Sequence, residues 1–501
     1  MNKEGSLSNF NKYLDKFDKF VIGLFPSYGV RRLKNRYKAK GLLDAVRNYD
    51  GASKSGRNSR WRATGNSADS EIRIALPTLR ARSRDLVRNN PYAAKAIEGI
   101  AANVVGGGIR PSIKHKDATA LKKAQELWED WGETTKCDFY NHLDFYGLQF
   151  QVMNAVAESG EVLARKVKNL KNPAFFEIQL LEGDHIDDDK DGINLPGGGY
   201  IKLGIEYNKK GKIVAYWLHE NHPGETIISE NYVSKRIDAK EIIHVFFVKR
   251  PGQSRGVPFG VSSFDKMRDF DEYERAQLIK QKVSACFTAF VTSGVEALPG
   301  YRKQNENIPL ERVEPGQIEY LRPNEEVTFG TPPSTEGYDI YAKKVLQQIA
   351  AGYGITYELL TNDLSNVNFS SGRMGWIEMG RMIAQWQNQI IVNKFCAGVW
   401  EWFADSIDIS ISKKTRAKAT WTVPRREMID PVKETKAMVE AVRAGFTSWQ
   451  GAIRELGRDP NEVLAEMGID KELFDKIGLM LSSDARYDPN RKPIDEIENA
   501  E

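Results

Sequence analysis

The sequence predicts an α+β fold built from several regions, on three observations. The first is the length of 501 residues, which exceeds what one hydrophobic core normally serves. The second is a change near Glu161 in the spacing of apolar residues, from a period of about 3.6, typical of helices, to about 2, typical of strands. The third is a pair of long helical segments, 261–291 and 338–353, that follow the strand-rich region.

The first 71 residues form a basic N-terminal arm that is expected to be partly disordered. Between Arg31 and Pro91 there are sixteen lysines and arginines against five aspartates and glutamates, whereas the whole chain has a net charge of +4. Glycine, serine and asparagine are frequent in residues 50–70, which favours disorder. Such an arm can contact nucleic acid by neutralising phosphates, or it can be a solvated segment, and the sequence leaves both interpretations open.

Residues 72–260 are predicted to form helices followed by a β-rich region. Apolar residues recur at helical spacing from Leu79 to Ile100, and Pro91 marks a break between two helices. Two more helices are expected at 118–133 and 143–159.

The β-rich region begins at Glu161. Five or six alternating, β-branched and aromatic segments are separated by turn residues over about ninety positions. The segment 251–260, rich in glycine and proline, closes the region.

Two long helices and a polar loop are predicted next. The helix at 261–291 is charged in its first half and mostly apolar in its second, and a mixed segment, 292–337, separates it from the helix at 338–353. The loop that follows, up to Ser371, is rich in asparagine and serine, and a long tryptophan-bearing helix is expected from Arg373 to about Phe403. This arrangement can present the loop to a partner.

The C-terminal part is predicted to contain a strand pair at 407–412 and 420–423, and then two or three short helices. The tail beyond residue 483 is polar and acidic and is expected to be disordered.

No motif in the sequence indicates an enzyme active site or a metal centre. Asp187, Asp189 and Asp191 match half of a calcium loop, but Gly198 stands where that loop has its bidentate glutamate, which favours a solvated acidic turn. A zinc site at His219 and His222 lacks further ligands, which favours surface histidines. The three cysteines are far apart and are expected to be free thiols, and no cofactor is predicted.

Several long segments, in the same order along the chain, resemble the lambda-type phage portal proteins. They include LRARSRDLVRNNPYAAKAI, AESGEVLAR, EIQLLEGDHID, IIHVFFVKRPGQSRGVPFG and DLSNVNFSSGR. The resemblance implies a ring of about twelve subunits at one capsid vertex, through which double-stranded DNA enters and leaves, and no catalysis. The implied partners are further copies of the chain, DNA, the terminase large subunit, major capsid or scaffold proteins and a head-completion protein, with no membrane.

The resemblance also implies a division of the chain into the regions of a portal subunit. These are an arm (1–71), a wing (72–260), a stem (261–291 and 338–353), a clip (292–337), a tunnel loop (354–371), a helix returning through the wing (372–404), a wing and crown region (405–482) and a tail (483–501).

The resemblance places the loop in the DNA channel. The residues expected there are Asn362, Asn366, Asn368, Ser370, Ser371 and Arg373. Amides and hydroxyls contact phosphates and sugars weakly and carry no sequence information, whereas many lysines or arginines would retain DNA. Acidic residues expected on the channel wall are Asp265, Asp269, Asp271 and Glu272, and the candidates for the subunit interface are Phe287, Phe290, Trp376 and Trp386.

Two other functions are weighed against this one. A metal-dependent nucleic-acid enzyme would use the aspartates at 187–191, but it needs further carboxylates that no motif supplies. An adaptor at a membrane surface would use the amphipathic, basic stretch 10–40.

Overall fold

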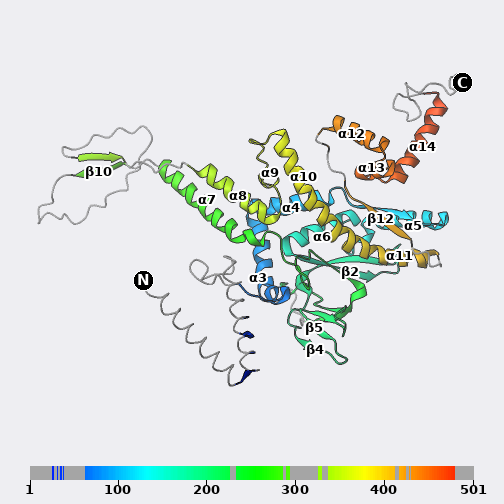
Figure 1. The fold of residues 1–501 in the computed structure, drawn as a ribbon, viewed down its shortest axis with the longest axis horizontal. Coiled ribbons are helices and arrows are strands. Elements are labelled where there is room, and N and C mark those ends of the chain that lie inside the picture. Colours follow the sequence, from blue (N-terminus) through cyan, green and yellow to red (C-terminus); the bar gives the residue numbers. More distant parts are fainter. Residues whose placement is uncertain are drawn as a thin grey trace. The chain divides into compact units, whose positions relative to one another are not determined.

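The structure is a computed structural model of the 501-residue chain. It describes residues 63–225, 233–285, 289–293, 325–329, 337–411, 417–424, 428 and 430–479, with six single positions before residue 63. The chain divides into two units, Met1–Ser67 and Ala68–Glu501, and every helix and strand named here belongs to the second (Figure 1).

Four helices open the second unit, as predicted. They are α3 (Ala68–Asn89), α4 (Pro91–Val105), α5 (Ala118–Trp131) and α6 (Phe145–Ser159). The break at Pro91 is confirmed: the side chain of Asn90 accepts hydrogen bonds from the backbone N–H groups of Tyr92 and Ala93 at 3.0 and 3.2 Å, and Pro91 needs no donor at the first helical position. Helix α6 ends at Gly160, whose φ of 91° suits glycine.

The β-rich region consists of two antiparallel sheets. Strands β2 (Glu161–Lys168), β3 (Phe176–Glu182) and β9 (Ile242–Phe246) form one in the order β3-β2-β9. The second has the order β4-β5-β6-β7-β8, formed by Ile193–Asn194, Tyr200–Lys202, Ile205–Tyr207, Ile213–Leu218 and Lys235–Asp238. Short 3₁₀ turns lie at Thr135–Cys137, Gly183–His185, Ala239–Glu241 and Val261–Ser263.

The main core joins the helices to the three-stranded sheet through aromatic side chains. Trp128 of α5 makes edge contacts with Phe145 and Phe403, each with a ring-centre distance of 5.0 Å. Cys137 and Cys396 are buried free thiols in this core, as predicted, and Cys286 lies outside the described residues.

The first long helix is shorter than predicted. Helix α7 covers Phe264–Ala285, and Ala289–Ser293 is not helical but forms strand β10, which pairs with β11 (Glu325–Phe329). The small and apolar residues that favoured a helix up to Val291 include a β-branched and aromatic run, which fits a strand equally well.

Helices α7 and α8 (Tyr338–Tyr353) run side by side in opposite directions (Figure 1). Tyr353, at the end of α8, donates to the sulfur of Met267 in the first turn of α7, at 3.7 Å. Tyr338, at the start of α8, donates to Glu274, two turns further along α7, at 3.1 Å.

After the short helix α9 (Tyr357–Thr361), one long helix runs from Phe369 to Ile411. It consists of α10 (Phe369–Trp386), a π-helical stretch (Gln387–Cys396) and α11 (Ala397–Ile411). The strand predicted at 407–412 is therefore wrong, because Phe403 and Ile407 continue the buried helical face. Strand β12 (Lys418–Thr422) pairs instead with β1 (Arg110–Lys114).

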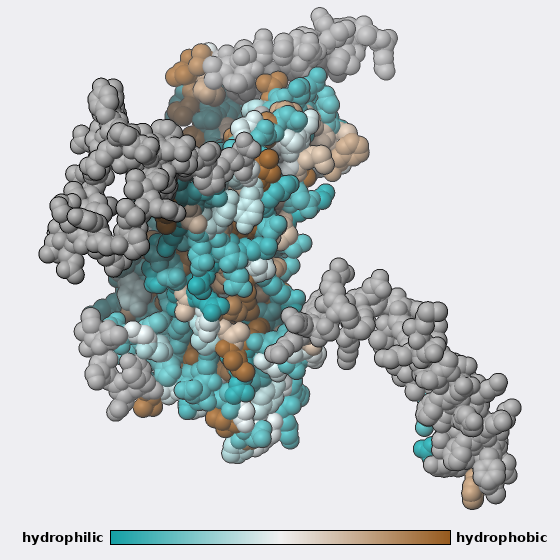
Figure 2. All heavy atoms as spheres, turned by 90° about the vertical axis from the view of Figure 1, so that its left-hand side faces the viewer, coloured by the Kyte–Doolittle hydropathy of each residue, from teal (hydrophilic) through white to brown (hydrophobic). Residues whose placement is uncertain are grey.

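Three helices follow: α12 (Pro431–Arg443), α13 (Trp449–Glu455) and α14 (Pro460–Ile477). Their number agrees with the prediction, but α14, with 18 residues, is longer than the short helices expected. In the part of the chain that the structure describes, no helix has both the length and the apolar character needed to cross a bilayer. Figure 2 shows hydrophobic side chains in separate patches among hydrophilic ones on one face of the molecule.

Candidate functional site

The turn between α9 and α10 is held by its own side chains. Asn362 ends α9 in the left-handed conformation, with φ of 56°, and its N–H donates to the carbonyl of Glu358 at 2.8 Å. Asp363 then accepts from the hydroxyl of Tyr357 at 3.0 Å and from the N–H of Ser365 at 3.0 Å. Hydrogen bonds from Ser365 and Tyr357 lower the pKa of Asp363, so the turn carries a negative charge at neutral pH.

Asn368 and Ser371 form a capping box that begins α10. The N–H of Ser371 donates to the Asn368 side chain at 2.8 Å, and the N–H of Asn368 donates to the Ser371 hydroxyl at 3.1 Å. The helix therefore begins at Phe369 and not at the predicted Arg373, and the predicted loop is shorter than its sequence suggests.

The six predicted channel residues thus divide into two groups. Asn362, Asn368 and Ser371 have structural roles in ending one helix and beginning the next. Asn366, Ser370 and Arg373 are exposed on the turn and the first turns of α10, where they can contact a partner.

The turn also exposes apolar side chains, which the sequence analysis did not identify. Leu364 is 66% exposed and Phe369 58%, and Met374 of α10 is exposed as well. Leu364 and Phe369 lie within the asparagine- and serine-rich run, so the polar composition of the loop gave no indication of exposed apolar side chains.

Three of the four predicted channel-wall residues lie on one face of α7. Asp265, Asp269 and Glu272 are spaced i, i+4 and i+7 and are all exposed. Asp271 faces a different direction and pairs with Arg275 at 2.9 Å. Because Arg268 lies 3.2 Å from Glu272, the negative charge of this face is partly balanced within the helix.

The predicted interface aromatics have different environments. Trp386 is only 2% exposed and lies against Phe259 with a ring-centre distance of 5.4 Å, so it belongs to the core of its own chain rather than to an interface. Trp376 is half-buried and lines a cavity of about 650 Å³. Phe287 lies outside the described residues, and only the backbone of Phe290 is described, in β10.

A buried charge network lies at the start of β2, and sequence reasoning missed it. Glu161 is fully buried and accepts from Arg80 at 2.6 Å, from Arg255 at 2.7 and 2.9 Å and from the N–H of Gly256 at 2.6 Å. His244 lies 3.0 Å from the same carboxylate. Arg255 also pairs with Asp188.

This network joins the segments that carry the family resemblance. Arg80 comes from LRARSRDL, Glu161 from AESGEVLAR, Asp188 from the turn after LEGDHID, His244 from IIHVFF and Arg255 from PGQSRGVPFG. Burial alone would raise the pKa of Glu161, but the charges of Arg255 and Arg80 and the hydrogen bond from His244 outweigh it and hold this pKa well below its usual value.

His244 makes the stability of this network sensitive to pH. Burial lowers the pKa of His244 below its usual 6.5, despite the neighbouring carboxylate. His244 therefore binds fewer protons in the folded protein than in the unfolded chain below pH 6.5. Its contribution to the free energy of unfolding should fall as the pH drops, by at most about 1.4 kcal/mol per pH unit. Glu161 should cause a second fall in the free energy of unfolding below pH 4.5, because its carboxylate is stabilised in the folded state.

We predict a smaller loss of stability between pH 7.5 and 5.5 in His244→Gln than in the wild-type chain, measured by urea unfolding at both pH values. Glutamine can still donate to Glu161 but does not titrate. Equal losses of stability in the two proteins would show that His244 does not cause the pH dependence of stability.

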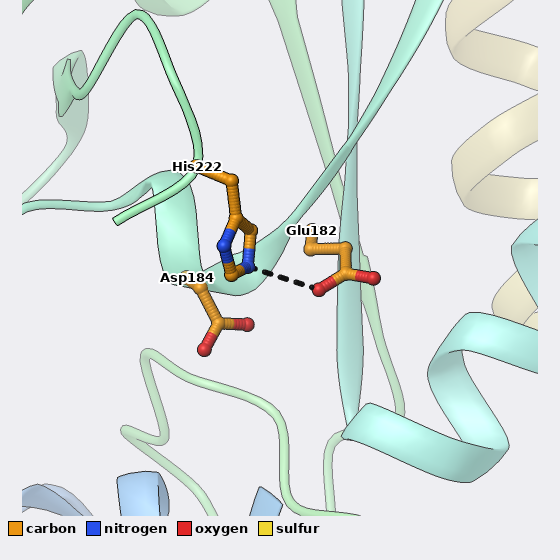
Figure 3. Close-up of side chains that lie close together, drawn as sticks. All are labelled: Glu182, Asp184 and His222. Atoms are coloured by element: carbon orange, nitrogen blue, oxygen red, sulfur yellow. Dashed lines mark ion pairs between the residues drawn. The ribbon is translucent and has the colours of Figure 1, made fainter. Parts of the chain in front are cut away.

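The side chains of Glu182, Asp184 and His222 lie close enough together to resemble a metal site (Figure 3). His222 lies 3.2 Å from Glu182, as the dashed line shows. However, the guanidinium of Arg84 lies 2.6 Å from Glu182 and 2.7 Å from Asp184, so a cation already neutralises both carboxylates. We assign no metal to this cluster.

The acidic turn at 187–191 is not simply solvated, contrary to the prediction. Asp187 is buried and accepts from the Ser234 hydroxyl, and Asp191 lies 2.9 Å from Arg73. These carboxylates therefore serve to hold the turn in place. His219 is also largely buried, 3.8 Å from Asp187, so the prediction of a surface histidine is wrong there.

Comparison with known proteins identifies the family. The model of the phage portal protein, lambda family, matches residues 54–387. The chain is 26% identical over 452 residues to the "Probable portal protein" of Halomonas phage phiHAP-1, covering 84% of this chain and 86% of the relative. It is 22% identical over 463 residues to "Portal protein B" of Escherichia phage lambda, covering 81% and 85%.

Two solved structures are similar at low identity. One, "Neck of empty GTA particle computed with C6 symmetry", matches with a TM-score of 0.48 at 13% identity, covering 81% of this chain and all of that one. The other, "Virion of native gene transfer agent (GTA) particle", matches with a TM-score of 0.46 at 12% identity, covering 79% and 97%. The family match spans two thirds of the sequence and includes all five members of the buried network, so this chain belongs to the lambda family of phage portal proteins, which are structural proteins of the virion and not enzymes.

Proposed function

We propose that about twelve copies of this chain form a ring at one vertex of a phage capsid, and that double-stranded DNA passes through the ring during packaging and ejection. The observation that carries this proposal is the exposed turn between α9 and α10. No lysine or arginine occurs in residues 345–372, and Asn366 of the turn and Ser370 at the start of α10 are exposed to solvent. A turn of this kind suits DNA that must move past it without being held.

The regions expected from the resemblance can be assigned to the observed elements. The wing would comprise α3 to β9, with residues 72–260, and the stem would be the antiparallel pair α7 and α8. The clip would begin after Ala285, because α7 ends there, and would include β10 and β11. The tunnel loop would run from residue 354 to the start of α10 and would include α9 and the exposed turn. Helices α12 to α14 would belong to the crown.

The exposed face of α7 would form part of the channel wall. Asp265 and Asp269 add negative charge there, and the pairing of Arg268 with Glu272 limits any positive charge that could hold phosphates. The negative charge of Asp363 would likewise limit the attraction of DNA to the turn. Repulsion from fixed carboxylates would keep DNA from adhering to the wall.

The remaining partners are proposed from the family. The terminase large subunit, a separate motor, and the head-completion protein would dock at the clip end, and the capsid or scaffold proteins would contact the wing. The basic residues of the N-terminal arm would contact DNA or capsid. In the subunit interface, Trp376, Phe287 and Phe290 remain candidates.

We predict that Asn366→Lys slows DNA packaging while rings still form. A lysine at the turn would be repeated in every subunit, and each added cation strengthens phosphate binding, so the loss should be relieved as salt is raised. The measurement is DNA packaged per unit time into empty capsids, together with electron microscopy of the rings.

The control is Asn194→Lys, which makes the same exchange at an exposed position of β4. It should package at the wild-type rate. If Asn366→Lys also packaged at that rate with rings intact, the turn would not face the DNA.

A further inference from the structure

The three C-terminal helices bury few side chains in a single chain. In the described part of this region, the buried residues are Ala452, Pro460 and Val463. Helices α12, α13 and α14 contact one another in sequence order and lie together near the C-terminal end in Figure 1. Most of their apolar surface therefore remains exposed.

Helix α12 and the turn after it expose a regular row of apolar and basic side chains. Val432 is 80% exposed, Val439 45% and Phe446 88%. Lys436 and Arg443 stand between them. From Val432 to Arg443 the row advances by four and three residues alternately, the spacing of helices that pack along their length, and Phe446 lies in the turn after the helix. We call these five residues the basic row.

Helix α14 exposes a similar row with the opposite charge. Ile469, Leu473 and Ile477 are spaced i, i+4 and i+8 and are 60%, 52% and 70% exposed. Glu466 and Asp470 lie on the same side of the helix. Val463, which is buried in the chain itself, lies one turn before Glu466 on the same side, so the exposed apolar part of this row begins after it. We call these five residues the acidic row.

The two rows complement each other in both polarity and charge. Each offers three apolar side chains, and the basic row adds two cations where the acidic row adds two anions. Glu466 already pairs with Arg458 in the same chain, but both side chains are about half exposed, so this pair can rearrange at little cost.

We propose that the basic row of one copy packs against the acidic row of the next copy. The inference rests on the proposed ring, which it deepens by naming one interface. The two surfaces differ, so each copy binds one neighbour through its basic row and another through its acidic row, and this head-to-tail arrangement forms a ring when the rotation per copy closes. A two-fold dimer would instead pair each surface with itself. A second copy of this chain is thus the partner that both rows fit.

A cysteine pair tests this contact directly. The variant carries Val439→Cys and Leu473→Cys, with Cys286→Ser to remove a native thiol; Cys137 and Cys396 are buried. After oxidation of the purified protein, we expect a ladder of covalent oligomers on a denaturing, non-reducing gel, extending towards the size of the ring. Each single-cysteine variant should give no species beyond a dimer.

Charge reversal supplies the second readout. Lys436→Glu with Arg443→Glu should reduce the ladder severalfold, and adding Glu466→Lys with Asp470→Lys in the same chain should restore it. Rings that are visible in the electron microscope but give no ladder would overturn this inference and leave the proposed function standing. An absence of rings in the unmodified protein, in the presence of capsid or scaffold protein as well as alone, would contradict the proposed function itself.

Discussion

Glu161→Gln should destabilise the protein strongly, by about 3–5 kcal/mol in the free energy of unfolding. This is the usual cost of removing one partner from a buried ion pair, because the other charge is left without compensation. Here two buried guanidiniums depend on the carboxylate: Arg255, which is fully buried, and Arg80. The amide of glutamine fills the same space, so a cavity contributes little to the loss.

The measurement is the midpoint of urea or thermal unfolding of the purified chain. Glu220→Gln is the matched control, because Glu220 pairs with Lys235 on the surface and its loss should leave the midpoint unchanged. An equal midpoint for Glu161→Gln and Glu220→Gln would show that the buried network does not stabilise the fold.

Gly352→Ala should loosen the junction between α7 and α8. A methyl group at Gly352 would overlap the hydroxyl of Ser263, in the turn that precedes α7, so one of the two segments must move. Overpacking of this kind typically costs about 1–3 kcal/mol. Because α8 is joined to the exposed turn by the short helix α9, a shift at this junction should also displace the turn, and we expect a lower yield of rings.

A second substitution separates this clash from other effects. Ser263→Ala removes the hydroxyl, so the double variant should recover part of the stability that Gly352→Ala loses, although the Cβ of Ser263 still lies only 2.9 Å from the new methyl group. Gly468→Ala, in α14, has open space around it and should be neutral or slightly stabilising. A Gly352→Ala chain as stable as the wild type would mean that the two helices do not approach this closely.

Much of the fold could be predicted from the sequence, because spacing reports local structure directly. The change of period at Glu161 coincides with the first residue of β2, and the break at Pro91 falls between α3 and α4. Helix ends were harder to place. Residues 287–291 suit a strand as well as a helix in sequence, and the pairing of residues 289–293 with residues 325–329 is a long-range contact that no local pattern encodes.

The candidate site was predicted only in part. The polar composition located the turn, but it did not show that Asn368 and Ser371 cap α10, since capping depends on where the helix begins. Nor did it distinguish Trp386, buried in the core, from the half-buried Trp376 ten residues earlier. The network around Glu161 joins residues from five separate segments, which only the fold brings together.

The most direct test of the central claim is the mass and symmetry of the purified protein, measured by light scattering and by class averages of particles in the electron microscope. We predict rings of about twelve subunits with a central hole wide enough for duplex DNA. A monomer that persists at high concentration, with no rings in the presence of capsid or scaffold protein, would contradict it.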